Sequence, residues 1–170
     1  DSERKYRQLV ETLQEGIWSV DENKVTTYVN PSMAEMLGYS EGEMVGRPLQ
    51  DFVEKKQHDR YDEFFQRRME GIKERYESVL IHKNGSRVSV IVEAAPIFDS
   101  KGNFMGSLAG VQDITDRKKA ERQLEKYSRN LEELVEERTR ELKEAQNQLI
   151  AAEKLSSLGE MAASVGHELR

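Results

Sequence analysis

The residues best suited to chemistry are His167 and its neighbour Glu168, close to the end of the sequence. A neutral imidazole nitrogen is a competent nucleophile near pH 7. Taken alone, a histidine beside a glutamate could equally be an exposed pair on a helix surface. The sequence contains no cysteine, which excludes disulfides, thiol catalysis and cysteine-ligated zinc, and we predict no metal site. The case for chemistry at His167 therefore depends on the segments that carry it.

The histidine follows a long segment with the pattern of a coiled coil. Apolar or small residues recur there at steps of four and three, with one arginine on the same seam. The seam positions are Ala120, Leu124, Tyr127, Leu131, Val135, Arg138, Leu142, Ala145, Leu149 and Ala152. The doubled step of four around Leu131 is a stutter, which unwinds a coiled coil locally. We predict a homodimeric coiled coil, either a passive stalk or a rod that switches between two packings.

A second seam begins near Lys154 and places His167 on the outside of the helix. Its positions are Leu155, Leu158, Ala162, Val165 and Leu169. His167 lies two residues from both Val165 and Leu169, which is roughly 200° around the helix from either. The imidazole is therefore predicted to point away from the seam, where another domain could reach it.

The first part of the sequence differs in composition from this helical part. All three prolines lie before residue 97, and beyond residue 115 the only aromatic residue is Tyr127. Residues 1–115 are therefore predicted to form a folded domain. The formal net charge of −6 argues against nucleic acid as a partner. No apolar run is long enough to span a membrane, so we expect a soluble, cytoplasmic piece whose parent could be anchored upstream.

The folded part reads as a mixture of helices and strands. Asn30 is predicted to cap a helix that Gly38 ends, and a longer helix carries an apolar stripe of Tyr61, Phe65 and Met69. The order of elements favours an α+β fold with helices on one face of an antiparallel sheet. The predicted helices cover residues 2–15, 30–38 and 57–69, and the predicted strands residues 16–20, 24–30, 75–82, 87–98 and 104–114.

These segments resemble a PAS sensor domain. The similarity is carried by "YVNPSMAEMLGYSEGEMVGRPLQDF" and "HKNGSRVSVIVEAAPIFDSKGNFMGSLAGVQDIT". It implies a PAS fold over residues 1–115, with a five-stranded antiparallel sheet and flanking helices. The closing Asp113, Ile114 and Thr115 imply a signal relay into the next helix, in which Asp113 anchors the junction to a nearby arginine or lysine. Thr115 is also predicted to cap that helix.

The last segment, "EKLSSLGEMAASVGHELR", resembles the H-box of sensor histidine kinases. The resemblance implies that His167 is the phosphoacceptor and that Glu168 holds its other ring nitrogen. It makes residues 116–153 a signalling linker and residues 154–170 the start of the dimerisation and phosphotransfer helix. ATP would come from an ATP-binding domain beyond Arg170, so we expect the fragment alone to be inactive. The phosphate would pass to an aspartate of a response regulator. The alternative is a PAS–coiled-coil interaction module without kinase output.

The ligand of the sensor domain is less well defined by the sequence. The stretch around His58 is similar to the one that carries the haem-ligating histidine of oxygen-sensing PAS kinases, but the arginine used over the haem is missing. We therefore favour a local hydrogen-bonding role for His58 over haem ligation. Photosensing through a cysteine adduct is excluded because cysteine is absent. Small residues at Gly106, Ser107, Ala109 and Gly110 could leave room for a small ligand or let a helix pack closely.

Overall fold

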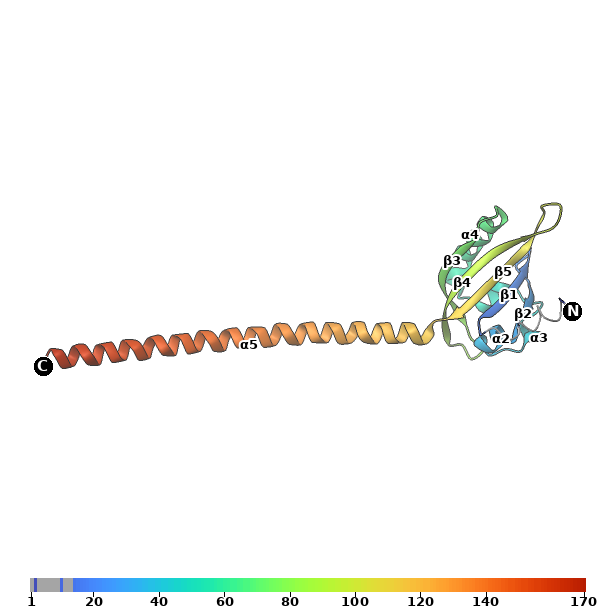
Figure 1. Ribbon diagram of the computed structural model, residues 1–170. Helices are drawn as coiled ribbons and strands as arrows, with labels where there is room; N and C mark the ends of the chain where they lie inside the picture. Colours follow the sequence, from blue (N-terminus) through green and yellow to red (C-terminus); the bar gives the residue numbers. More distant parts are fainter. Residues whose placement is uncertain (1, 3–9, 11–13) are drawn as a thin grey trace. The chain divides into compact units, whose positions relative to one another are not determined.

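The computed structural model describes residues 2, 10 and 14–170. The chain divides into an N-terminal unit that ends at Lys119 and a C-terminal unit, Ala120–Arg170 (Figure 1). The helix predicted for residues 2–15 falls almost entirely outside the described residues. The two units are described separately below.

The N-terminal unit is built on one antiparallel sheet of five strands. The strands are β1 (Gly16–Asp21), β2 (Thr26–Val29), β3 (Glu74–Ile81), β4 (Arg87–Phe98) and β5 (Phe104–Asp113). Their order in the sheet is β2-β1-β5-β4-β3, so the chain's first and last strands pair at its centre (Figure 1). The prediction of an α+β fold with a five-stranded antiparallel sheet is confirmed.

One face of this sheet forms the core. Along β4, alternate residues Val88, Val90, Val92 and Ala94 are buried, as their period of two predicts. The helices cover this face, and their apolar side chains join the same core cluster. Between the strands, Gly85 and Gly102 adopt positive φ angles of 84° and 83°, which confirms both predicted turns.

The helix α2 (Pro31–Leu37) begins and ends as predicted. The Asn30 side-chain oxygen accepts hydrogen bonds from the amides of Met33 and Ile17, at 3.0 and 2.8 Å, so one side chain caps α2 and fixes it to β1. Gly38 ends the helix with φ 73°. A Cβ at Gly38 would collide with the His82 ring, so this close approach also requires glycine.

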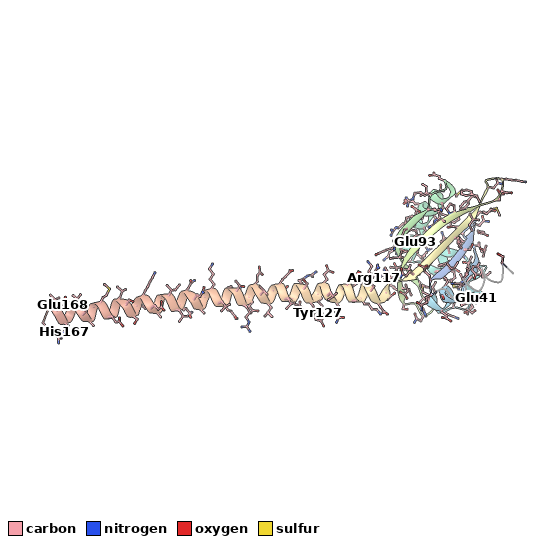
Figure 2. The ribbon with its side chains drawn as sticks, viewed as in Figure 1. Glu41, Glu93, Arg117, Tyr127, His167 and Glu168 are labelled. Carbon is pink, nitrogen blue, oxygen red and sulfur yellow. The ribbon has the colours of Figure 1, made fainter. Side chains whose placement is uncertain are left out.

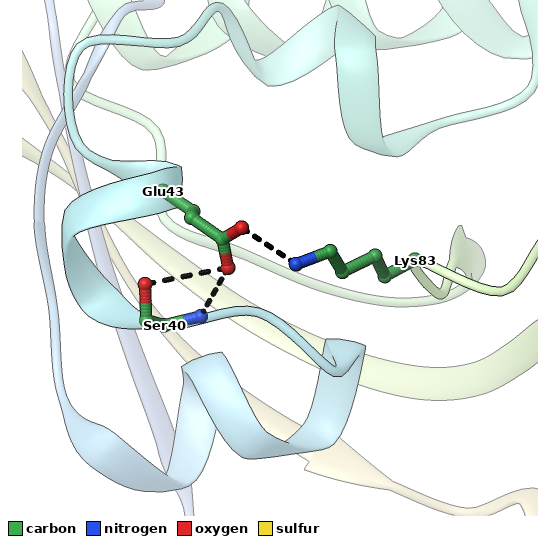
Figure 3. A network of polar contacts seen from close by, with 3 residues as sticks. All are labelled: Ser40, Glu43 and Lys83. Carbon is green, nitrogen blue, oxygen red and sulfur yellow. Dashed lines mark hydrogen bonds and ion pairs between the residues drawn. The ribbon is translucent and has the colours of Figure 1, made fainter.

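Short helical turns connect α2 to the longer helix α4. They are α3 (Glu41–Met44), η1 (Leu49–Phe52) and η2 (Lys55–Gln57). At α3, the Glu43 carboxylate accepts hydrogen bonds from the Ser40 amide and hydroxyl and pairs with Lys83 at 2.5 Å (Figure 3). Lys83 follows β3, so this network ties the start of α3 to the β3–β4 turn.

The buried face of the helix α4 (His58–Met69) differs from the predicted apolar stripe. Tyr61 and Phe65 are buried as expected, but Met69 is 52% exposed. The buried face instead contains Phe64 and Arg68. Met69 follows the buried Arg68 in the last turn of α4, but its side chain is not on the buried face.

The helix α5 (Thr115–Glu168) begins in the N-terminal unit and continues through the C-terminal unit. Gly159 and Gly166 lie within it without interrupting it. The helix also passes through residue 154 without a break, so the change of seam there is a change of pattern in a continuous helix. The predicted division at residues 153 and 154 stays a prediction.

Candidate functional site

His167 and Glu168 lie on the last turn of α5 and both are exposed (Figure 2). The helix is regular up to this point, since the Leu169 amide still donates to the Val165 carbonyl at 3.1 Å. In such a helix His167 lies about 200° from Val165 and from Leu169. Among the described contacts, no hydrogen bond joins the side chains of His167 and Glu168. The role predicted for Glu168 on the imidazole therefore stays a prediction.

The seam of α5 is apolar and exposed in the single chain. Leu124, Leu142, Leu155 and Val165 each expose more than half of their side-chain surface, and no residue of α5 is buried. Exposed leucines at heptad spacing are typical of a helix whose packing partner is another helix.

The three predicted relay residues are brought together where β5 meets α5. The Asp113 carboxylate accepts a hydrogen bond from the Thr115 amide at 2.8 Å. Ile114 is buried and its amide donates to the Ser89 carbonyl, while the Thr115 hydroxyl accepts from the Ser89 amide at 3.0 Å. The junction is therefore held to β4 by hydrogen bonds on both sides of Ser89.

The first of two expectations about this junction was wrong, and the second stays a prediction. The Thr115 hydroxyl is engaged with Ser89 and does not cap α5. Among the described residues, Asp113 forms no ion pair with an arginine or lysine. The ion pairs at the start of α5 are made instead by Glu77 of β3, which lies 2.6 Å from Lys118 and 3.6 Å from Arg117.

Sequence reasoning missed this role of Glu77. The hydrogen bond from Lys118 is the main cause that lowers the pKa of the Glu77 carboxyl, so the pair stays charged at neutral pH. All three residues belong to the N-terminal unit. The first turn of α5 is thus fixed to β3 as well as to β4. Only the position of Glu77 on a strand, one residue before the buried Ser78, could have suggested an outward-facing partner.

A cavity of about 30 Å³ lies in the core of the N-terminal unit. Its walls combine apolar residues with a few polar groups. The lining residues are Trp18, Val20, Leu49, Tyr61, Arg68, Tyr76, Leu80, Val92, Ser107, Ala109 and Val111. Ser107 and Ala109 thus bear out the prediction that small residues of β5 leave space. Gly106 has a different role, because a Cβ there would collide with the Val20 carbonyl of β1.

The polar groups of the cavity form two hydrogen-bonded sets. The Arg68 Nη2 atom donates to the Tyr76 hydroxyl at 2.7 Å. The Tyr61 hydroxyl lies 2.8 Å from the Ser78 hydroxyl, which donates to the Gln57 side-chain oxygen. Burial raises the pKa of both Tyr61 and Tyr76, so both phenols are neutral and able to donate.

The structure does not bring His58 to this cavity. His58 is the first residue of α4, and it is absent from the cavity wall. Its Nε2 atom is buried without a hydrogen-bond partner among the described residues. The cavity is also far smaller than the roughly 300–1,000 Å³ of pockets that hold larger ligands. The residues present therefore do not fit a haem bound through His58.

Within the described residues, no group of three metal-ligating side chains lies close enough together to hold a metal ion. In the same part of the chain, no helix is both long and apolar enough to cross a membrane.

Comparison with known proteins decides the family. A family model described as the PAS fold matches residues 4–114. The chain belongs to the PAS family. The N-terminal unit is its PAS domain, and the predicted PAS fold is confirmed.

Solved structures agree with this assignment. The PAS domain of a Colwellia psychrerythraea protein superposes with a TM-score of 0.64 and 19% sequence identity. It covers 68% of this chain and 99% of that one. At this level of identity the likeness concerns the fold alone.

Curated relatives extend the similarity beyond the PAS domain. Sporulation kinase C of Bacillus subtilis is 30% identical over 177 residues, which cover 100% of this chain and 37% of the relative. The signal transduction histidine-protein kinase AtoS of Escherichia coli is 23% identical over 166 residues, covering 95% of this chain and 22% of the relative. The chain therefore spans well under half the length of these kinases. The similarity supports a sensor role in two-component signalling.

Proposed function

We propose that the chain is the sensor and linker segment of a histidine kinase, in which the PAS domain controls phosphorylation of His167 through α5. The observation that carries the proposal is that a single helix, α5, connects the Asp113–Thr115 junction to the "GHELR" segment. Sporulation kinase C aligns with 100% of the chain, which supports the proposal that the PAS domain and the "GHELR" segment act together.

The proposed reaction is transfer of the γ-phosphoryl group of ATP to a ring nitrogen of His167. The nitrogen–phosphorus bond forms as the bond to the ADP oxygen breaks, and ADP leaves. The carboxylate of Glu168 holds the other ring nitrogen and stabilises the imidazolium that develops. An ATP-binding domain of the same parent supplies ATP. A response-regulator aspartate then takes the phosphoryl group, and His167 returns to its free form. We place both transfers in the cytoplasm.

The homodimer is part of the proposal. Leucines such as Leu124, Leu142 and Leu155 are exposed in the single chain, and a second copy of α5 would bury them at heptad positions. His167 would then lie on the outer face of the pair, because it is roughly opposite to Val165 and Leu169. This arrangement leaves the imidazole accessible to the ATP-binding domain.

The relay starts at the junction residues Asp113, Ile114 and Thr115. Hydrogen bonds to Ser89 and the Glu77–Lys118 ion pair link the first turn of α5 to β4 and β3. A change in the sheet would therefore move or rotate the start of the helix. Adding three or four residues between Asp116 and Lys154 in the full-length parent should change kinase output, whereas adding seven should largely preserve it. Equal kinase output for all insertions would show that α5 only connects the two ends and does not transmit a signal.

The phosphoacceptor is tested by mixing this chain with an isolated histidine-kinase ATP-binding domain and radiolabelled ATP. The sequence holds three histidines, so label on histidine is a choice between His58, His82 and His167. His167→Ala should abolish labelling, and His58→Asn, the control, should leave it unchanged. Glu168→Gln should slow it. Label that persists in His167→Ala would contradict the assignment and favour the interaction-module alternative.

A further inference from the structure

Arg68 is the one charged residue among the buried residues that the structure describes. It is 3% exposed, whereas the other buried polar residues, Thr26, Asn30, Ser78 and Ser107, are neutral. A buried guanidinium has lost most of its hydration, and proteins normally compensate such a charge with a carboxylate. Among the described residues, however, no carboxylate forms an ion pair with Arg68. The nearby Glu74 pairs through Oε1 with Arg67 of the same helix at 2.5 Å, and its Oε2 atom is buried without a hydrogen-bond partner among the described residues.

Two hydrogen-bond donors at the Arg68–Tyr76 pair have no acceptor. The Nε atom of Arg68 is buried and makes no hydrogen bond within the described part of the chain. Its Nη2 atom donates to the Tyr76 hydroxyl, which leaves the hydroxyl proton of Tyr76 available. Both residues line the cavity. The cavity wall thus includes one positive charge and two free donors. The other side chains of the wall with polar groups, Trp18, Tyr61 and Ser107, already have hydrogen-bond partners.

The rest of the cavity wall is apolar. Val20, Val92, Ala109 and Val111 come from the three central strands of the sheet, and Trp18 closes one side with its indole nitrogen bonded to Thr26. The volume of about 30 Å³ compares with the roughly 10–15 Å³ that is enough for one water molecule. A ligand of a few non-hydrogen atoms fits, with an acceptor-only anionic head and a short apolar body.

We infer that the PAS domain binds a small monocarboxylate in this cavity. One carboxylate oxygen accepts from the Arg68 Nε–H and the other from the Tyr76 hydroxyl, and the short carbon chain contacts the valines of the sheet. A carboxylate is favoured because it supplies the missing negative charge together with two planar acceptors that match a guanidinium. The positive charge of Arg68 disfavours amines, and the apolar wall disfavours larger polar anions.

The ligand would act from a central place in the sheet. Val92 and Val111 are paired across β4 and β5, and the same two strands lead to Ser89 and Asp113 at the start of α5. Binding of a ligand in the cavity could therefore change the conformation of the junction. This regulatory meaning rests on the proposed function, whereas binding itself does not.

The test is a titration of the 170-residue chain with formate, acetate and propionate at constant ionic strength. Binding is followed by two-dimensional amide NMR and by the melting temperature. At least one of the acids should give saturable shifts at residues around Arg68 and raise the melting temperature. Acetamide, a neutral molecule of the same shape as acetic acid, should give neither. Failure of all three acids would overturn the inference.

Matched variants assign the binding to Arg68. Arg68→Met removes the charge and keeps most of the side-chain volume, and it should weaken binding at least tenfold. Arg67→Met, on the same helix turn but 43% exposed, should bind like the wild type. Tyr76→Phe, which keeps the ring, should weaken binding several-fold and serves if Arg68→Met does not fold. Unchanged affinity in Arg68→Met or in Tyr76→Phe would contradict the site.

The outcomes separate this inference from the proposed function. If His167 is labelled but none of the three acids binds, only the inference of a carboxylate ligand is refuted. Binding that depends on Arg68 without labelling of His167 would sink the kinase assignment and leave the ligand in place.

Discussion

The two units of this chain treat their apolar residues in opposite ways. In the PAS domain, Phe52 and Val90 are fully buried, and the helices α2 and α4 close over one face of the sheet. In the C-terminal unit, Leu142 is 67% exposed and the other seam leucines are similar. The hydrophobic effect is satisfied within the chain in the first case, whereas in the second the apolar residues stay exposed in the single chain. This exposure is the basis for proposing a second copy of α5 as its partner.

In the proposed function this difference separates the sensing unit from the unit that carries the phosphoacceptor. The cavity and Arg68 lie in the unit with its own core, where a ligand can be enclosed. His167 lies in the unit that has no core, where another domain can approach it. The helix α5 runs from the PAS domain into the C-terminal unit, so in the proposed function a signal passes from the Asp113–Thr115 junction along this helix.

The largest expected effect comes from the seam. Leu142→Asp removes two leucines from each dimer, about 1.5–3 kcal/mol for each, and brings two negative charges together. We expect the dimer dissociation constant, measured by sedimentation equilibrium, to rise by about two to four powers of ten. Asn147→Asp adds the same charge five residues later on the outer face and should leave the constant nearly unchanged. If both variants raised the dissociation constant equally, Leu142 would not lie in the dimer interface.

The core of the PAS domain should show the next largest effect. Phe52 contacts Trp18 and Tyr39 edge-to-face at 5.3 and 5.4 Å and is fully buried. Phe52→Ala should lower the free energy of unfolding by about 3–5 kcal/mol, measured by urea denaturation. Phe98→Ala is the control, because Phe98 is 42% exposed, and its cost should be well below that of Phe52→Ala. The dimer constant should change in neither variant.

The junction gives a smaller effect. Asp113→Ala removes the acceptor of the Thr115 amide and should cost about 1 kcal/mol of stability. Asp116→Ala is the matched control, since its carboxylate is fully exposed and lies 3.8 Å from Lys119. Both changes remove a negative charge near the start of α5, so the difference between them isolates the hydrogen bond. If the two variants unfold at the same urea concentration, Asp113 does not hold the junction.

The smallest effect is expected at the surface pair Glu43–Lys83. The hydrogen bond from Lys83 is the main cause that lowers the pKa of Glu43 from 4.5 to about 2. Because the folded-state pKa is depressed, the pair stabilises the fold above about pH 4.5 and loses this contribution as the pH falls towards 2. In a carboxyl NMR titration, Lys83→Met should move the Glu43 midpoint back towards 4.5. If the Glu43 midpoint in Lys83→Met is the same as in the wild type, the pair does not form in solution.

Much of the fold follows from local features of the sequence. Asn30, Pro31 and Gly38 specify α2 because each satisfies a backbone requirement of a helix end. The alternating valines of β4 identify its buried face, and the glycines at 85 and 102 identify the turns. The heptad spacing likewise identifies α5 from the amino-acid pattern alone. In each case neighbours in the sequence suffice to determine the conformation.

The features that were missed depend on contacts between distant segments. Arg68 occupies a position that periodicity would assign to an apolar residue, and its burial follows from the way α4 covers β3, β4 and β5. Met69 was expected to be buried because it continues the spacing of Tyr61 and Phe65, but the buried face of α4 contains Arg68 instead. Thr115 was expected to cap its own helix, but Ser89, 26 residues earlier, provides a competing partner. The small residues of β5 indicated space for the cavity, but the polar side chains that α4 and β3 contribute to its wall have no local signal in the sequence.

We expect the seam of α5 to face a second copy of the helix while His167 faces outward. The absence of native cysteine allows single cysteines to be placed along the helix and oxidised to disulfides between copies. Crosslinking should be strong for Leu158→Cys, Ala162→Cys and Val165→Cys, and weak for Glu160→Cys and His167→Cys. Strong crosslinking at His167, or equal crosslinking at all five positions, would contradict the account.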